Sequence, residues 1–144
     1  MPFVRHLAIR CRNLETSRKF YESGIGWRFL GYRPGGGGLD LTDGEVNVTL
    51  IQQPATWSPE RHEDGNEHLH FGVIVDDLRN CWQRLRQLGA EFAADSVKSG
   101  ETAAGDRPPE VSFKVFDPDG NVFDVTCNQQ EWVGVKMPLP QRGE

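Results

Sequence analysis

The chain contains a strand-like segment that occurs twice, and this duplication constrains its fold more than any other feature. The two copies are HLAIRCRNL at residues 6–14 and HFGVIVDDL at residues 70–78. Each copy opens with a histidine, has Asn or Asp seven positions later, and continues into a stretch with helical periodicity. Two similar modules are therefore predicted to pack together. Because His6 and His70 hold equivalent positions, modules related by a pseudo-twofold axis can bring both imidazoles to one metal ion.

The length and the cysteine content restrict the class of protein. The 144 residues suffice for one domain, or for two half-domains that share a core. Three scattered cysteines without a CxxC pair favour reduced thiols rather than a disulfide framework. The sequence contains neither a recognisable secretory signal nor an apolar run long enough to span a bilayer. We therefore expect a cytoplasmic protein with no membrane partner.

The charge pattern argues against a nucleic-acid partner. The formal net charge is -5, and the basic residues are scattered. Nucleic-acid binding proteins usually carry a denser positive patch. Arg79, Arg84 and Arg86 lie along one predicted helix and are expected to form its solvated face.

The first module is predicted to contain a strand, a helix and three more strands. Alternation in residues 4–11 puts His6, Ala8 and Arg10 on one face of the strand. The predicted elements are strands at residues 4–11, 27–32, 38–41 and 46–52, and a helix from an Asn13 N-cap to Gly24.

The second module repeats this order. Its predicted elements are strands at residues 70–75, 91–93, 111–116 and 121–127, and a helix from an Asp77 N-cap to Gly89. The DPDG sequence at residues 117–120 predicts the turn between the last two strands. The expected division of the chain is a first module at 1–53, a linker at 54–66, a second module at 67–130 and a C-terminal tail at 131–144.

These patterns predict an α+β fold in which two modules form curled mixed sheets around a central cavity. Residues that share the parity of the histidines are expected to point into the cavity. That parity makes Asp124 an inward carboxylate, and the equivalent position of the first module is Thr49. The polar residues of cavity parity are candidate substrate contacts: Asn47, Thr49, Ser112 and Lys114.

The paired segments, with FKVFDPDGNVFDVT at residues 113–126, resemble the vicinal oxygen chelate superfamily. That superfamily includes glyoxalases, extradiol dioxygenases and bleomycin-resistance proteins, and the resemblance covers roughly residues 3 to 128. It implies paired βαβββ modules, a homodimer and a small-molecule substrate. It also implies metal ligands from the first and last strands of the modules, which here are His6, His70 and Asp124.

Two imidazoles and one carboxylate can hold a divalent ion and leave coordination positions open for two neighbouring substrate oxygens. Fe(II) is favoured, with Mn, Ni, Zn or Co as alternatives. Glyoxalases place a carboxylate where Thr49 stands in this chain, so an extradiol-dioxygenase-like reaction is placed slightly ahead. The alternatives are a glyoxalase-like lyase or isomerase and a drug-binding protein of the bleomycin-resistance type.

Three questions stay open at this stage. His68 shares the parity of His70 and is an alternative ligand. The site is completed either within one chain or across a dimer. No residue is assigned as the catalytic acid or base.

Overall fold

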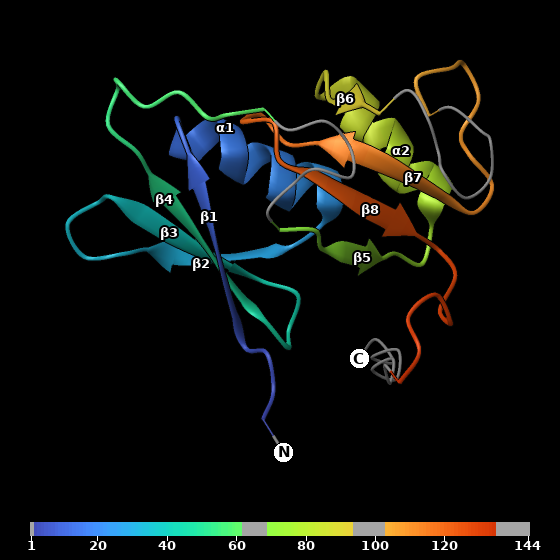
Figure 1. Cartoon of the computed structure of the whole chain (residues 1–144), viewed down its shortest axis with the longest axis horizontal. Coiled ribbons are helices and arrows are strands. Elements are labelled where there is room, and N and C mark those ends of the chain that lie inside the picture. Colours follow the sequence, from blue (N-terminus) through green and yellow to red (C-terminus); the bar gives the residue numbers. More distant parts are fainter. Residues whose placement is uncertain (1, 62–68, 94–102, 135–144) are drawn as a thin grey trace.

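The structure is a computed structural model that describes residues 2–61, 69–93 and 103–134. Its strands form two four-stranded sheets in the described residues, one from each half of the chain (Figure 1). The sheet orders are β1-β4-β3-β2 and β5-β8-β7-β6. The first sheet comprises β1 (His6–Cys11), β2 (Arg28–Tyr32), β3 (Gly38–Thr42) and β4 (Asn47–Gln52). The second comprises β5 (Gly72–Ile74), β6 (Glu91–Phe92), β7 (Ser112–Phe116) and β8 (Val122–Thr126).

The two sheets have the same topology. In each, the opening strand pairs in parallel with the last strand, and the other neighbours are antiparallel. A helix follows the opening strand in each half: α1 (Leu14–Lys19) with the π-helical turn η1 (Phe20–Ile25), and α2 (Leu78–Gln87). The predicted α+β fold of two βαβββ modules is confirmed.

The predicted N-caps are also confirmed. The side chain of Asn13 accepts a hydrogen bond from the backbone N–H of Thr16 at 2.9 Å. Asp77 does the same for the N–H of Asn80, also at 2.9 Å. Each cap satisfies one of the donors that the first helical turn leaves without an intrahelical partner, and this fixes where both helices begin.

The prediction that the first helix ends at Gly24 is wrong. The helix widens into η1 and ends at Gly26, whose φ of 102° is the left-handed conformation typical of a helix end. Gly24 has a different role, because a Cβ atom there would lie only 2.7 Å from Leu85 Cδ2 of α2. The missing side chain lets η1 and α2 approach closely.

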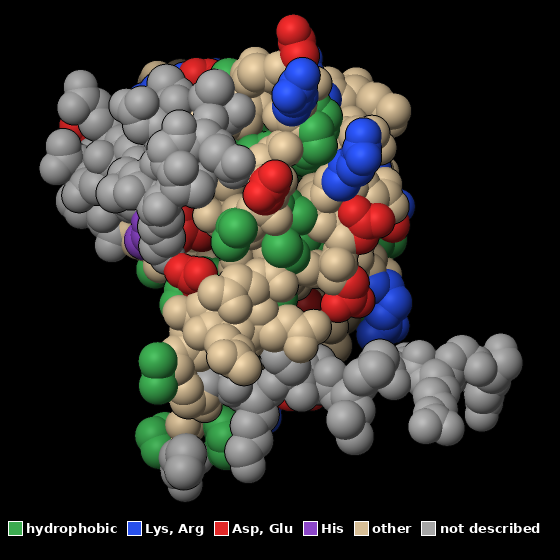
Figure 2. Space-filling view, turned by 90° about the vertical axis from the view of Figure 1, so that its right-hand side faces the viewer, with side chains coloured by type: hydrophobic (Ala, Val, Ile, Leu, Met, Phe, Trp, Pro, Cys, Tyr) green, Lys and Arg blue, Asp and Glu red, His purple; other side chains and the backbone are tan. Residues whose placement is uncertain are grey.

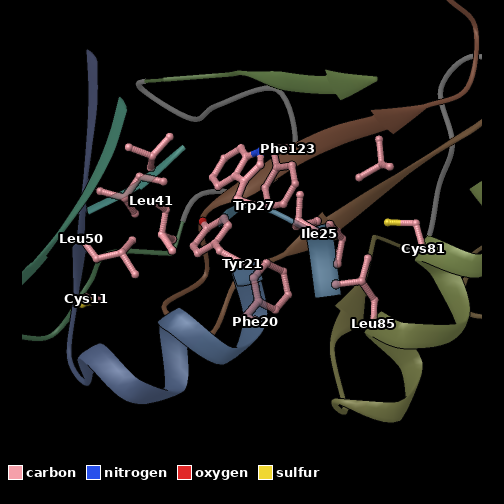
Figure 3. Close-up of a cluster of buried hydrophobic side chains, with 14 of the residues drawn as sticks. Cys11, Phe20, Tyr21, Ile25, Trp27, Leu41, Leu50, Cys81, Leu85 and Phe123 are labelled. Carbon is pink, nitrogen blue, oxygen red and sulfur yellow. The ribbon is translucent and has the colours of Figure 1, made fainter. Parts of the chain in front are cut away.

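One hydrophobic core joins the two modules. Tyr21 stacks on Trp27 with ring centroids 5.1 Å apart, and Trp27 stacks on Phe71 at 6.4 Å. Phe71 stacks in turn on Phe123 of β8 at 4.6 Å. Figure 3 shows three of these rings, Tyr21, Trp27 and Phe123, between α1 with η1 and the strands. Each buried aromatic removes a large apolar area from water, so this stack holds the modules together.

The turn between β7 and β8 adds a polar contact between the modules. The fully buried hydroxyl of Tyr21 donates to Asp117 Oδ2 at 2.7 Å. Burial raises the pKa of Asp117, although hydrogen bonds from Asn121 and Tyr21 counteract part of that effect. Asp119, in the same turn, forms an ion pair with Arg12 at 2.9 Å. The DPDG sequence therefore anchors the second module on the first.

The shared core determines where the histidine faces point. Ile9 and Cys11 of β1 are buried in the core, whereas His6, Ala8 and Arg10 are exposed on the opposite face. On β8, Phe123 and Val125 are core residues, so Asp124, which lies between them, has the opposite parity. The histidine-bearing faces therefore lie on the outer sides of the two sheets.

The described surface carries mixed charge. Acidic and basic side chains are interspersed on the face shown in Figure 2, with no continuous basic area. Within residues 2–61, 69–93 and 103–134, no helix has the length and apolar character needed to cross a membrane.

Candidate functional site: two half-sites on separate sheets

The strand register identifies equivalent positions in the two sheets. In the first sheet, the residue two positions after the histidine pairs with β4, and β4 pairs with β3. In the second sheet, the corresponding residue pairs with β8, and β8 pairs with β7. The equivalent rows are Ala8, Thr49 and Asp40 in the first sheet, and Gly72, Asp124 and Lys114 in the second. The expected equivalence of Thr49 and Asp124 is therefore present in the backbone pairing itself.

The second half-site consists of His70, Asp124 and Lys114. β5 begins at Gly72, two residues later than predicted from the sequence, so His70 lies just before the strand. Its Nε2 lies 2.8 Å from Asp124 Oδ2, and Lys114 Nζ lies 4.0 Å from Asp124 Oδ1. The side chain of Asp124 is 15 % exposed and that of His70 is 39 % exposed. A carboxylate and an imidazole nitrogen thus converge at a position that solvent can reach.

The C-terminal part of the described chain covers this half-site on one side. A Cβ atom on Gly72 would lie 2.3 Å from Cζ2 of the Trp132 indole. The indole therefore lies directly against the backbone of Gly72, which pairs with Asp124. Ser112, a candidate substrate contact, is 9 % exposed on β7. The Trp132 indole and the burial of Ser112 therefore leave less accessible surface around Asp124 than strand parity alone predicts.

The first half-site begins with a contact between His6 and Asn47. His6 Nδ1 lies 2.8 Å from Asn47 Oδ1. An amide oxygen can accept a hydrogen bond but cannot donate one. The Asn47 oxygen is then the acceptor that faces His6, so the neutral imidazole carries its proton on Nδ1. His6 Nε2 keeps its lone pair and can act as a ligand.

Two residues of the first half-site, Asp40 and Arg33, are absent from the sequence predictions. The hydroxyl of Thr49 donates to Asp40 Oδ1 at 2.6 Å. Arg33 Nε lies 3.1 and 3.2 Å from the two Asp40 oxygens, and its Nη2 donates to Thr49 Oγ1 at 2.9 Å. Register counted across the turn at residues 43–46 would have found Asp40. No pattern signals Arg33, which follows β2 and whose long side chain reaches Thr49 on β4.

The ion pair with Arg33 changes the acidity of Asp40. Partial burial by itself raises the pKa of Asp40, but hydrogen bonds from Thr49 and Arg33 outweigh burial and lower it. Asp40 is therefore held as a carboxylate that takes up a proton only weakly.

The structure brings together some of the predicted metal ligands but not all three. His70 and Asp124 are in contact, and His6 lies on the other sheet. Among the described residues, no group of three or more His, Cys, Asp or Glu side chains is placed to hold a metal ion. The alternative ligand His68 lies outside the described residues. One chain thus presents two half-sites.

Comparisons with known proteins identify the family. Residues 4–125 match the Glyoxalase/Bleomycin resistance protein/Dioxygenase superfamily. The chain belongs to this superfamily. A lactoylglutathione lyase of Neisseria meningitidis serogroup B is 30% identical over 122 residues, which are 80% of this chain and 83% of that protein. A lactoylglutathione lyase of Haemophilus influenzae is 28% identical over 140 residues, which cover 92% of this chain and 97% of that protein.

A solved structure shares the fold. The fosfomycin resistance protein FosX of Mesorhizobium loti has a TM-score of 0.61 at 16% identity, covering 90% of this chain and 94% of that one. At this identity the likeness concerns the fold alone. The names of the two sequence relatives support a glyoxalase-like lyase better than the extradiol-dioxygenase-like reaction that the absence of a carboxylate at position 49 had placed slightly ahead.

Proposed function

We propose that this protein is a metal-dependent, glyoxalase-like lyase or isomerase that acts on a small molecule with two neighbouring oxygens. We further propose that it works as a homodimer, in which the first half-site of one copy faces the second half-site of the other. The contact between His70 and Asp124, at a position equivalent to that of His6 and Thr49, is the observation that carries the proposal. The similarity to two lactoylglutathione lyases supports the reaction class.

The donor atoms of the second half-site fit a divalent ion. His70 Nε2 and Asp124 Oδ2 are 2.8 Å apart. Neighbouring ligands on a metal with bonds of about 2.1 Å are separated by about 3 Å, so little movement is needed. Nitrogen and carboxylate donors suit Fe(II), Mn, Ni, Zn and Co alike. His70 and Asp124 would hold the ion, and His6 Nε2 of the other copy would complete the set.

The packing of the single chain supports a shared site. The common core holds the two histidine-bearing faces on the outer sides of their sheets, so one chain does not bring them together. Ile51, which has the parity of Thr49 on β4, is 38 % exposed, and Ala8, which pairs with Thr49 on the neighbouring strand β1, is also exposed. A second copy placed against this face would bury apolar surface and bring the half-sites together.

The carboxylates of the site differ in what they can do. When bound, the ion would polarise the two substrate oxygens and so acidify the neighbouring C–H bond. Asp40 is poorly suited to take that proton because Arg33 and Thr49 already hydrogen-bond to its oxygens. We assign the proton transfer to Asp124, whose Oδ2 would hold the ion while its Oδ1 would accept the proton from one carbon and return it to the adjacent carbon.

The first test measures metal content and activity together. Protein purified without chelator is analysed for metals and assayed with a hemithioacetal of glutathione. We expect bound Ni or Zn and isomerisation, and loss of both in His70→Ala. The exposed residue Asp76 provides the control Asp76→Asn, which should behave as wild type. Iron with oxygen uptake on a catechol would instead support a dioxygenase, and no metal at any stage would leave a drug-binding protein.

The second test addresses the dimer. His6→Ala and His70→Ala are purified separately, unfolded together in equal amounts and refolded. If each site takes residues from two copies, half of the dimers are mixed and each mixed dimer has one intact site, so activity returns to about a quarter of wild type. If the site forms within one chain, every chain remains defective. Mixing then restores no activity, which would refute the shared site.

A further inference from the structure

The first half-site has a neutral hydroxyl where the second half-site has a carboxylate, and the Arg33 guanidinium lies against that hydroxyl. By register, Thr49 is equivalent to Asp124. The hydroxyl of Thr49 is not isolated, because it accepts from Arg33 Nη2 and donates to Asp40. Asp40 and Arg33 neutralise each other, so this half of the site offers no net negative charge to a ligand.

The geometry of Arg33 leaves part of its guanidinium available. A guanidinium has five N–H bonds. One edge, made by Nε and Nη2, serves Asp40 and Thr49. Two N–H bonds on Nη1 and one on Nη2 have no partner among the described residues. The side chain is 48 % exposed, so solvent and ligands reach this outer edge.

The backbone and one glycine hold Arg33 in this position. The N–H of Arg33 donates to the carbonyl of Gly38 at 2.8 Å, at the base of the glycine-rich turn between β2 and β3. A Cβ atom on Gly38 would lie 2.9 Å from Leu50 O and 3.7 Å from Arg33 Cδ. Because Gly38 has no side chain, the space through which the Arg33 side chain reaches β4 stays open. An ordered guanidinium loses little freedom when it binds a ligand.

We propose that the outer edge of Arg33 binds an anionic group of the substrate, a carboxylate or phosphonate, while the vicinal oxygens occupy the metal site. Two parallel N–H bonds match the two oxygens of such a group. Asp40 is the positioning residue, because it orients the guanidinium without touching the ligand. This inference rests on the proposed function, since it requires the face that carries His6 to line the substrate cavity.

The experiment compares ligands that share one chelating part and differ in charge. The probes are 3,4-dihydroxybenzoate, 3,4-dihydroxyphenylacetate and 3,4-dihydroxyphenylphosphonate, each against neutral 3,4-dihydroxybenzamide, titrated calorimetrically into the metal-loaded protein. We expect at least one anionic probe to bind more tightly than the amide. A hydrogen-bonded charge pair gives a preference of about 10- to 100-fold. Whether the carboxylates or the phosphonate gain more identifies the anion.

Variants assign the preference to Arg33. Arg33→Met should abolish the preference, and Arg33→Lys, which keeps the charge but lacks the paired donors, should reduce it about 10-fold. Arg28→Gln is the matched control, because Arg28 is an exposed arginine at the start of β2, the strand that Arg33 follows. Circular dichroism and thermal unfolding verify that each variant is folded.

The outcomes that would overturn the inference are distinguishable. Equal binding of charged and neutral probes, or a preference that survives in Arg33→Met, refutes the role of Arg33 alone. If the protein takes up no metal and binds no probe, the proposed function is refuted and the inference with it; if the metal-loaded protein binds no probe, the inference alone is refuted.

Discussion

Replacing Tyr21 by phenylalanine tests the polar contact between the two modules. The substitution removes only the hydroxyl that donates to Asp117 Oδ2 at 2.7 Å, and leaves the ring in its stack with Trp27. A hydrogen bond to a charged group contributes about 1.5–3 kcal/mol. For a chain of this size a loss of about 2 kcal/mol lowers Tm by about 4–8 °C. Urea unfolding followed by circular dichroism at pH 7.5 measures the change.

The pH dependence of this effect has a definite sign. Burial raises the pKa of Asp117 above its ordinary value of 3.8, so the folded state holds that proton more tightly than the unfolded state. The stabilisation from protonated Asp117 is present at low pH and is lost as the pH rises through the folded-state pKa. At pH 4.5 more of Asp117 is neutral, and a neutral hydrogen bond contributes only about 1 kcal/mol. Tyr21→Phe should therefore cost less stability at pH 4.5 than at pH 7.5.

A control separates the buried contact from tyrosine chemistry in general. Tyr32 is 53 % exposed, and on the surface its hydroxyl accepts a hydrogen bond from Arg18 and donates one to Glu15. Tyr32→Phe should change the free energy of unfolding by less than about 0.5 kcal/mol at both pH values. An equal effect of the two substitutions, or the same loss for Tyr21→Phe at both pH values, would refute the role assigned to Asp117.

Four further predictions concern packing and thiol chemistry. Gly24→Ala should destabilise the protein by about 1–3 kcal/mol in urea unfolding, since the new methyl group would overlap Leu85, and the exposed Ser23→Ala should not. Of the three cysteines, only Cys127 should react quickly with a thiol reagent at pH 8, because the other two, Cys11 and Cys81, are 0% exposed. Burial raises the pKa of each of those two thiols from 9.0 to about 11. The unfolded thiols ionise at lower pH than the folded ones, so the free energy of unfolding should fall between pH 9 and pH 11. Constant stability over that range would contradict the burial of these two thiols. Gly72→Ala should displace the indole of Trp132 and increase its fluorescence quenching by acrylamide, relative to a Trp132→Phe background that lacks this signal.

Much of the local structure could be predicted because it depends on neighbours in the sequence. The caps at Asn13 and Asp77 need only a side chain three residues before the bonded N–H, and both are present as expected. Gly24 was interpreted wrongly because a glycine near a helix end fits two roles. Only the position of Leu85 on α2 decides that this glycine serves a close approach.

The candidate site was predictable only in part. Strand parity and the duplicated segment place His6, His70 and Asp124 on the same face of their sheets. The strand register confirms that Thr49 and Asp124 hold equivalent positions. The assignment of these side chains to a metal stays a prediction. Asp40 could have been found by counting register across one hairpin. Arg33 could not, because the reach of a long side chain across neighbouring strands has no period in the sequence.

The sequence alone determined the faces of each strand, the helix starts and the division into two similar modules, because these follow from alternation, capping and repetition over short distances. The tertiary structure decided which faces meet. Aromatic stacking between Tyr21, Trp27 and Phe71 buries the helix-facing sides of both sheets in one core. The faces that carry His6 and Asp124 consequently lie outside that core. A pattern along the chain specifies which residues share a face of a strand or helix. The free energy of packing decides which other element covers that face.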